Sequence, residues 1–179
     1  MLDYKILLMK QLKYFLLLLL LGCSSTKVIY DYDSKTNFKV FKTFNFFDDA
    51  GKGLNELDIK RITNELKNGL QKKGMKLSDT PDVYINIISE QAESVNRNTI
   101  GVGIGGGGNV GFGISGGIPI GAKKINQQLT IDFVDSTNDN LLWQGIANSK
   151  IKVNIGQEER LVHYKKVITE MLMNYPPNK

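Results

Sequence analysis

The stretch Asp82-Val83-Tyr84-Ile85-Asn86-Ile87-Ile88-Ser89 decides how the rest of the chain can fold. Val83, Ile85 and Ile87 alternate with a second set of residues that includes Ile88, so the two sets point to opposite faces of a strand. Each set contains large apolar side chains, a pattern typical of a strand inside a sheet rather than at its edge. We therefore predict a central strand over residues 82–89.

Other segments with strand periodicity lie on both sides of this stretch. Residues 28–30 predict a short strand, and the aromatic-rich residues 41–47 predict another, with phenylalanines on one face. Residues 129–133 alternate apolar and polar side chains, and residues 135–140 read as a turn into the strand of residues 141–143. The last two strands are therefore expected to form a hairpin.

A helix is predicted to begin at Asn55. Asn55 and Asp58 can satisfy the free amides at its start, and Gly74 is placed to cap its end. Apolar side chains recur at helical spacing between these limits: Ile59, Ile62, Leu66 and Leu70.

A second helix is predicted from about Gln157 to Asn174, and it stops before Pro176 and Pro177. Its apolar stripe comprises Leu161, Tyr164, Ile168, Met171 and Tyr175. The order of the elements is two strands, a helix, a run of strands and a helix. This order predicts a single α+β domain over residues 28–179, with both helices on one face of a largely antiparallel sheet.

Gly101–Gly121 holds 11 glycines in 21 residues. It contains the spacing of a dinucleotide fingerprint, but no helix opens after it to meet a pyrophosphate, so we expect no nucleotide. Glycine alternates with apolar residues on both sides of residues 105–109, which predicts a floppy hairpin extending the sheet. This hairpin is either a mobile extension or a contact surface for a membrane or a partner, in which case the contact residues are Val102, Ile104, Val110, Phe112 and Ile114.

The first residues resemble a secretory signal. An apolar run from Phe15 to Leu21 follows two lysines and ends in Leu20-Leu21-Gly22-Cys23, which resembles the lipobox of bacterial lipoproteins. By that resemblance residues 1–22 are a signal peptide, Leu20, Leu21 and Gly22 are recognised by the signal peptidase, and Cys23 carries the lipid. Residues 23–27 then form the lipidated cysteine and a short tether.

Two other readings of this region are weaker. A transmembrane helix needs about 20 mostly apolar residues, and this run is too short unless two lysines are buried. An ordinary signal peptide would leave Cys23 in an exported protein without a disulfide partner. In enteric lipoproteins an aspartate after the lipidated cysteine signals retention in the inner membrane. Ser24 stands at that position, so the resemblance implies the outer membrane, with the domain facing the periplasm.

Composition narrows the chemistry. The formal charge of +5 falls to +3 once residues 1–22 are removed, and the remaining charges are interspersed, so no nucleic-acid partner is expected. One cysteine and one histidine, His163, leave no cysteine- or histidine-based metal cluster, and we expect no metal and no cofactor. Residues 135–140 resemble the start of a calcium loop, but Ile146 stands where glutamate is required, which favours the hairpin turn.

Several short segments match one family in order and spacing over nearly all of the mature chain. They are Asp31-Tyr32-Asp33, Phe41-Lys42-Thr43-Phe44, Lys73-Gly74, Pro81-Asp82-Val83, Leu142-Trp143-Gln144-Gly145 and Tyr175-Pro176-Pro177. Together they resemble the bacterial lipoprotein family that carries domain of unknown function 4136 (DUF4136). The resemblance implies a membrane-anchored, extracytoplasmic domain without an established activity, and it supplies no catalytic residues.

We therefore expect a non-enzymatic lipoprotein of the cell envelope that binds or scaffolds another envelope protein and is held to the membrane through Cys23. Two alternatives stay open. The first is an accessory subunit of an envelope transport machine. The second is a hydrolase that uses aspartate and glutamate, for which two buried carboxylates facing each other in a cleft would be the deciding observation.

Overall fold

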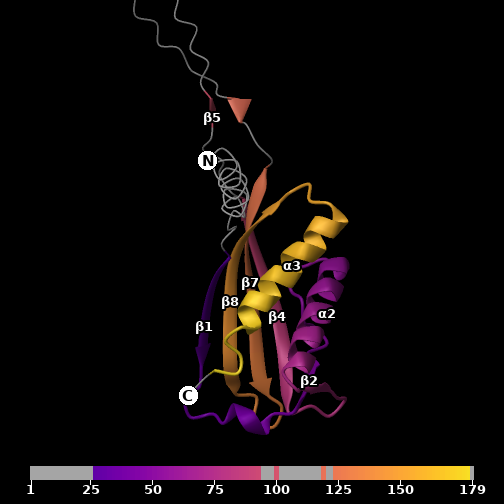
Figure 1. The fold of residues 1–179 in the computed structure, drawn as a ribbon, viewed down its shortest axis with the longest axis vertical. Coiled ribbons are helices and arrows are strands. Elements are labelled where there is room, and N and C mark those ends of the chain that lie inside the picture. The colour runs from indigo at the N-terminus through magenta and orange to yellow at the C-terminus, as the bar shows by residue number, and fades with distance from the viewer. Residues whose placement is uncertain (1–25, 94–98, 101–117, 120–122, 178–179) are drawn as a thin grey trace, which may run out of the picture.

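The computed structural model describes residues 26–93, 99–100, 118–119 and 123–177. Within these ranges, six strands form one sheet and two helices lie together on one of its faces (Figure 1). The elements are β1 (Lys27–Tyr32), the 3-10 turn η1 (Phe38–Val40), β2 (Thr43–Phe46), α2 (Glu56–Lys72), β3 (Lys76–Leu77), β4 (Val83–Glu93), β5 (Thr99–Ile100), β6 (Ile118–Pro119), β7 (Lys124–Asp135), β8 (Leu141–Lys152) and α3 (Gln157–Leu172). Neither of these helices is long and apolar enough to cross a membrane.

The strands of the main sheet follow the order β1-β8-β7-β4-β2-β3. The β1–β8, β8–β7 and β7–β4 pairs are antiparallel, whereas β2 runs parallel to both β4 and β3. The predicted α+β class with both helices on one face is confirmed, and the sheet is mixed, with its antiparallel part the larger. The parallel part arises because α2 connects β2 to β3 across the face of the sheet.

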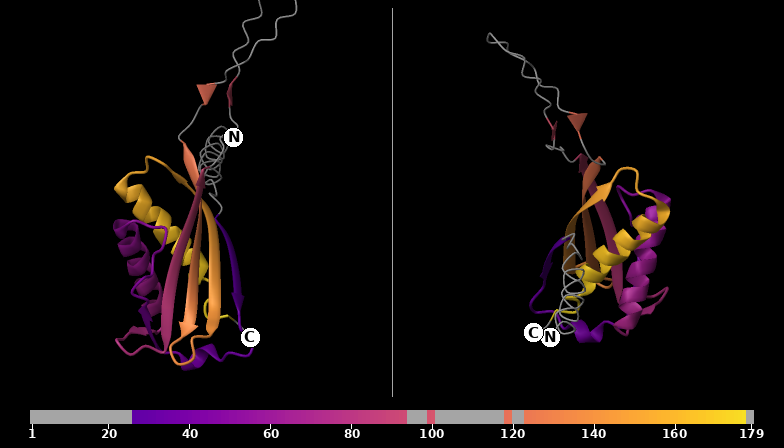
Figure 2. Two further views of the ribbon diagram at one scale, coloured as in Figure 1. Left: turned by 180° about the vertical axis from the view of Figure 1, so that it is seen from behind. Right: turned by 45° about the horizontal axis from the view of Figure 1, so that its top comes forward.

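The predicted central strand is β4, which lies between β7 and β2. Val83, Ile85 and Ile87 are fully buried beneath the helices. The alternate residues, including Tyr84 and Ile88, are only half-buried, because neither α2 nor α3 covers the other face of the sheet (Figure 2, left). The strand thus carries apolar side chains on both faces, as predicted, but only those on the helix side are fully buried.

The predicted hairpin is confirmed as β7 and β8, joined by a turn at residues 136–140. It is much longer than its apolar stretches, since each strand has 12 residues and the pairing continues through polar positions to Lys124 and Lys152. Two side chains organise the turn. The Asp135 carboxylate accepts a hydrogen bond from the Thr137 backbone amide at 2.8 Å, and the side-chain Oδ1 of Asn138 accepts one from the Asn140 backbone amide at 3.0 Å. Such side-chain-to-backbone bonds explain why Asp and Asn gather there.

Helix α2 begins and ends as its sequence predicts. The Asn55 side chain accepts a hydrogen bond from the Asp58 amide at 3.0 Å, which satisfies one of the free amides of the first turn. At the other end Gly74 has φ +88°, and the Met75 and Gly74 amides donate to the carbonyls of Leu70 and Gln71. This pattern is the Schellman motif, which favours glycine because a side chain is strained at positive φ.

Asp58 plays a different part from the one that its position in the first turn predicts. Its carboxylate is 2% exposed and accepts hydrogen bonds from Arg61 of α2 and from Arg160 of α3, each at 2.8 Å. The Asn55 amide group donates a third bond to it at 2.9 Å. Asp58 therefore ties the starts of the two helices together and fixes them side by side in the same direction.

The stripe of α3 is confirmed for Tyr164, Ile168 and Met171, which are fully buried. The prediction that Leu161 belongs to the buried stripe is wrong, because this side chain is 39% exposed. Val167 and Leu172 are buried in addition. The helix crosses the sheet at an angle, so its contact stripe lies closer to Val167 than a straight projection predicts (Figure 1).

Beyond α3, Tyr175 closes the far end of the core. Its ring meets Phe133, Trp143 and Phe38 edge to face, at centroid distances of 4.5, 5.5 and 6.0 Å. Trp143 in turn lies over Gly145, where a Cβ atom would be 2.4 Å from the indole ring. The absence of a side chain at Gly145 thus makes room for the tryptophan.

Removal of the Asp58 carboxylate is expected to destabilise the fold strongly. In Asp58→Ala, Arg61 and Arg160 lose the counter-charge between the two helices, and loss of one partner from a buried ion pair typically costs about 3–5 kcal/mol. The free energy of unfolding of the variant is measured by urea titration. As a control, Glu159→Ala breaks the exposed Lys152–Glu159 pair and is expected to cost less than about 1 kcal/mol. Similar losses in the free energy of unfolding of the two variants would contradict the role of Asp58 in holding the two helices together.

Candidate functional site

The side of the sheet opposite α2 and α3 is covered by no helix of the described residues (Figure 2), and we call it the open face. It is formed by side chains that alternate with buried ones along β1, β4, β7 and β8 and therefore point away from the helices. They include Lys27, Ile29, Asp31, Tyr84, Asn86, Ile88, Glu90, Lys124, Asn126, Gln128, Thr130, Asp132, Gln144, Ile146, Asn148 and Lys150.

The pairing register arranges these side chains in rows across the strands. One row holds Asn86, Asp132, Gln144 and Asp31; the next holds Ile88, Thr130, Ile146 and Ile29; the third holds Glu90, Gln128, Asn148 and Lys27. The middle row thus places three isoleucines between two polar rows. Ile88 and Ile146 are half-buried, and Ile29 at the edge is 50% exposed.

Asp132 is a partly buried carboxylate in the first row. Burial raises the pKa of its carboxyl group above the ordinary value of 3.8, because a charged group is poorly solvated between neighbouring strands. The Gln144 side chain donates a hydrogen bond to Asp132 Oδ1 at 2.8 Å and acts in the opposite direction. On the open face the Asp132 carboxylate therefore has one neutral donor, Gln144, and forms no ion pair with a cation among the described residues.

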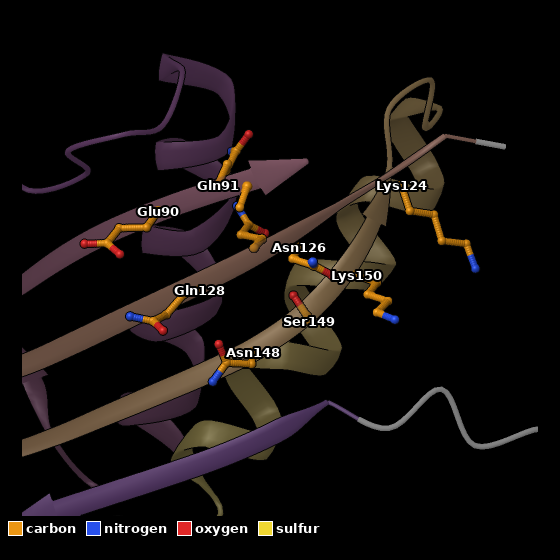
Figure 3. Close-up of a pocket in the computed structure, with 10 residues that line it drawn as sticks. Glu90, Gln91, Lys124, Asn126, Gln128, Asn148, Ser149 and Lys150 are labelled. Carbon is orange, nitrogen blue, oxygen red and sulfur yellow. The ribbon is translucent and has the colours of Figure 1, made fainter. Parts of the chain in front are cut away.

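At the end of the sheet where the chain leaves β4 and enters β7, the open face becomes an open groove of about 820 Å³. Figure 3 shows it from the helix-free side, with the helices behind the strands. Its lining is polar and comes from β4, β7 and β8: Glu90, Gln91, Ala92, Lys124, Asn126, Gln127, Gln128, Asn148, Ser149 and Lys150. Two lysines and one glutamate give this groove an excess of positive charge.

A buried polar side chain connects the groove to the helix layer. Gln127 is 2% exposed, and its amide nitrogen lies 3.1 Å from Ser89 Oγ and 3.2 Å from the Tyr164 hydroxyl. Burial is the main reason that the pKa of Tyr164 is raised. Because these partners come from β4, β7 and α3, the network fixes the floor of the groove and does not reach out of it.

His163 lies on α3 at the boundary between its buried and exposed sides. The ring is half-buried and its Nε2 is 3.4 Å from Ser149 Oγ. Burial lowers the pKa of His163, and the nearby charges of Arg160 and Lys166 lower it further.

The carboxylates of Asp58 and Asp132 lie on different sides of the sheet. Asp58 faces the helix layer and is held by two arginines, whereas Asp132 faces outward beside Gln144. These two groups therefore do not form the facing pair that the hydrolase alternative requires.

The residues singled out as sites from the sequence lie outside the described ranges. This is true of Leu20, Leu21, Gly22 and Cys23, and of the contact residues Val102, Ile104, Val110, Phe112 and Ile114. Around the latter, β5 and β6 pair antiparallel through Thr99–Pro119 and Ile100–Ile118. Sequence reasoning missed the open face as a site, although the alternation along residues 82–89 and 129–133 was the signal for it.

Comparison with known proteins agrees with the fold and the sequence segments. A family model described as "Domain of unknown function (DUF4136)" matches residues 28–177. The chain belongs to the DUF4136 family. No curated protein sequence matches this DUF4136 chain.

Solved structures share the fold of this DUF4136 domain at low sequence identity. A PDZ domain protein from Parabacteroides distasonis aligns with a TM-score of 0.52 and 19% identity, over 95% of this chain and 41% of that chain. The chain thus spans less than half the length of that protein. The PelC dodecamer from Paraburkholderia phytofirmans aligns with a TM-score of 0.50 and 10% identity, over 83% of this chain and 95% of that chain. At these identities the likeness concerns the fold alone.

Neutralisation of Asp132 is expected to stabilise the domain at neutral pH. A raised pKa means that the folded state holds the proton more tightly than the unfolded state, so the favourable contribution is complete below 3.8 and is lost as the pH rises through the raised value. Asp132→Asn keeps an oxygen for Gln144 and removes the charge. We expect a higher thermal midpoint than the parent at pH 7 and no difference below the ordinary pKa of aspartate.

The matched control is Asp139→Asn in the exposed turn, where Asn also tolerates the positive φ of 56°. The control is expected to show no pH-dependent gain. A stability loss at pH 7 in Asp132→Asn would mean that the charge of Asp132 is needed by a partner group on the open face.

Proposed function

We propose that this DUF4136 chain is a lipoprotein of the bacterial cell envelope, anchored through Cys23 in the outer membrane and facing the periplasm. We further propose that its domain has no catalytic activity and binds or scaffolds another envelope protein through the open face. The lipobox-like Leu20-Leu21-Gly22-Cys23 supports the anchor. The family match supports the domain boundary, since it begins at residue 28, directly after the short tether.

The row of isoleucines on the open face carries the proposal of a binding domain. Ile29 and Ile146 lie side by side on β1 and β8, and Ile88 on β4 follows in the same row beyond Thr130 of β7, with polar rows on either side. An apolar strip framed by polar groups is the arrangement of many protein interfaces, because the strip gains from leaving water and the frame supplies hydrogen bonds. The helices are fully used on the opposite face, so this strip has no cover within the described part of the chain.

A second copy packed face to face fits this surface poorly. Lysines concentrate at one end of the open face, and Asp31 and Asp132 lie further along it. Two anchored copies related by an axis normal to the membrane would place lysine against lysine. An antiparallel pair would bring opposite charges together, but its anchors would lie at opposite ends of strands of roughly 40 Å, too far apart for one membrane surface.

The favoured occupant is therefore a different envelope protein that presents apolar side chains opposite the isoleucine row. PelC, whose fold is similar, is described as a dodecamer, but this likeness concerns the fold alone. Assembly with copies of the chain itself is consequently kept as an outcome of the test. A role as accessory subunit of a transport machine would be one form of the same binding function.

The anchor is tested by Cys23→Ser. Lipidation at ~0.8 kcal/mol per buried methylene holds a chain with two or more acyl groups firmly in the bilayer, so the parent should sediment with membranes. The variant is expected to lose membrane attachment, measured as its share in the membrane pellet after a high-salt wash. Ser24→Ala, which keeps the cysteine, is the control and should sediment like the parent. A variant that still pellets completely would sink the lipoprotein assignment.

The binding surface is tested by a photo-crosslinking amino acid at Ile146 in cells. Val162, which is 65% exposed on α3, is the matched position on the helix side. We expect a specific adduct from Ile146 that is absent from Val162 and is lost when Ile88→Lys is introduced. An adduct of twice the mass of the chain would identify a self-contact, and adducts only from Val162 would move the interface to the helices.

A further inference from the structure

Three lysines gather at one end of the open face, and we call this group the lysine end. Lys27 begins β1 and Lys124 begins β7, while Lys150 lies near the end of β8. The pairs Lys27–Asn148, Asn126–Lys150 and Lys124–Lys152 place all three at the same end of the sheet. Each is exposed, and within the described ranges none of the three forms a salt bridge.

The acidic side chains of Glu159 and Glu90 lie near the lysine end but do not neutralise its charge. Glu159 lies 3.4 Å from Lys152, so that glutamate is matched to a different lysine. Glu90 shares the groove with Lys124 and Lys150, and it reduces the charge of the lining without cancelling it (Figure 3). A net positive surface is left, formed by flexible ammonium groups that suit phosphate oxygens.

The same end is where the chain leads back to Cys23. Only three residues lie between Cys23 and Lys27, and at a maximum of about 3.5 Å per residue the four steps from one to the other span at most roughly 14 Å. Strand β7 runs from Lys124 at this end to Asp135 at the other, and 12 residues correspond to roughly 40 Å. A lipid on Cys23 therefore keeps the lysine end close to the bilayer and leaves the Asp135 end free to point away.

We propose that the lysine end lies against the anionic phospholipid headgroups of the membrane that holds Cys23, so that the sheet stands away from the bilayer. This inference rests on the proposed lipid anchor. The ammonium groups of Lys27, Lys124 and Lys150 meet headgroup phosphates, and the charge attraction acts only over about 8 Å at physiological ionic strength. Lysines at the distant end, such as Lys35 and Lys39, are beyond that range in this orientation.

This orientation also leaves the isoleucine row free. Ile88 and Ile146 lie further from the lysine end than Asn148 does, by the register of β4 and β8. The lipid contact and the protein contact therefore use successive parts of one surface.

The experiment measures how far two positions lie from the bilayer in the complete, lipidated chain. Because Cys23 is the single cysteine and is blocked by lipid, Asn126→Cys and Thr137→Cys can each be spin-labelled alone. Asn126 is exposed beside the lysine end, and Thr137 is exposed in the turn at the other end. The chains are reconstituted in phosphatidylcholine vesicles with or without phosphatidylglycerol and a nickel-chelating lipid, which relaxes nearby nitroxides.

We expect a several-fold larger relaxation at Asn126 than at Thr137 in vesicles with phosphatidylglycerol, and a smaller contrast in neutral vesicles or at high salt. The triple variant Lys27→Gln, Lys124→Gln, Lys150→Gln should reduce the contrast to the neutral-vesicle value. The control triple variant Lys35→Gln, Lys39→Gln, Lys42→Gln makes the same change of net charge at the other end and should leave the contrast intact.

Each remaining outcome separates the hypotheses. Labelling of Cys23 itself, or a chain that does not stay with the vesicles, would refute the lipid anchor and with it the proposed function. An anchored chain with equal relaxation at the two positions would overturn the orientation alone. A contrast that is insensitive to phosphatidylglycerol and to the lysine substitutions would show that the tether orients the domain and that the lysines do not bind lipid, leaving them for an acidic protein.

Discussion

The packing of both helices against one face of the sheet is the constraint on which the rest of the structure depends. The ion pairs of Asp58 hold the starts of α2 and α3 together, and Tyr175 meets Met75 near their ends, with its hydroxyl 3.7 Å from the sulfur. The two helices thus form one layer on one face of the sheet, and the described residues contain no second helix layer for the other face. The opposite face of the sheet must then remain compatible with water while still presenting apolar side chains to whatever it contacts.

Much of this fold could be predicted from local sequence. The limits of α2 follow from Asn55 and Gly74, whose roles depend on a few neighbouring backbone groups, and the β7–β8 turn follows from Asp and Asn side chains that bond to their own backbone. The alternation along residues 82–89 identified β4 and its place inside the sheet. Local patterns were sufficient here because the deciding interactions span only a few residues.

The rest depends on contacts between distant segments, which periodicity does not specify. Nothing in the first turn of α2 indicates that Asp58 meets Arg160, 102 residues later, and nothing in the polar start of β7 indicates that Gln127 is buried against Tyr164. The rows of the open face also require the register between four strands, since a shift by one residue would turn every side chain to the other face. A candidate surface of this kind becomes visible only when the strands are paired.

The seat of Trp143 over Gly145 gives the domain an optical property of its own. Trp143 is the single tryptophan of the chain, it is fully buried, and its ring lies 5.0 Å from Phe133 and 5.5 Å from Tyr175. Tyr175 belongs to the short segment after α3, so the surroundings of the indole include the last described part of the chain. The fluorescence of Trp143 therefore reports on the docking of that C-terminal segment. Its emission maximum is at short wavelength while Tyr175 covers the indole ring, and it shifts to longer wavelength when the segment detaches and water reaches the ring.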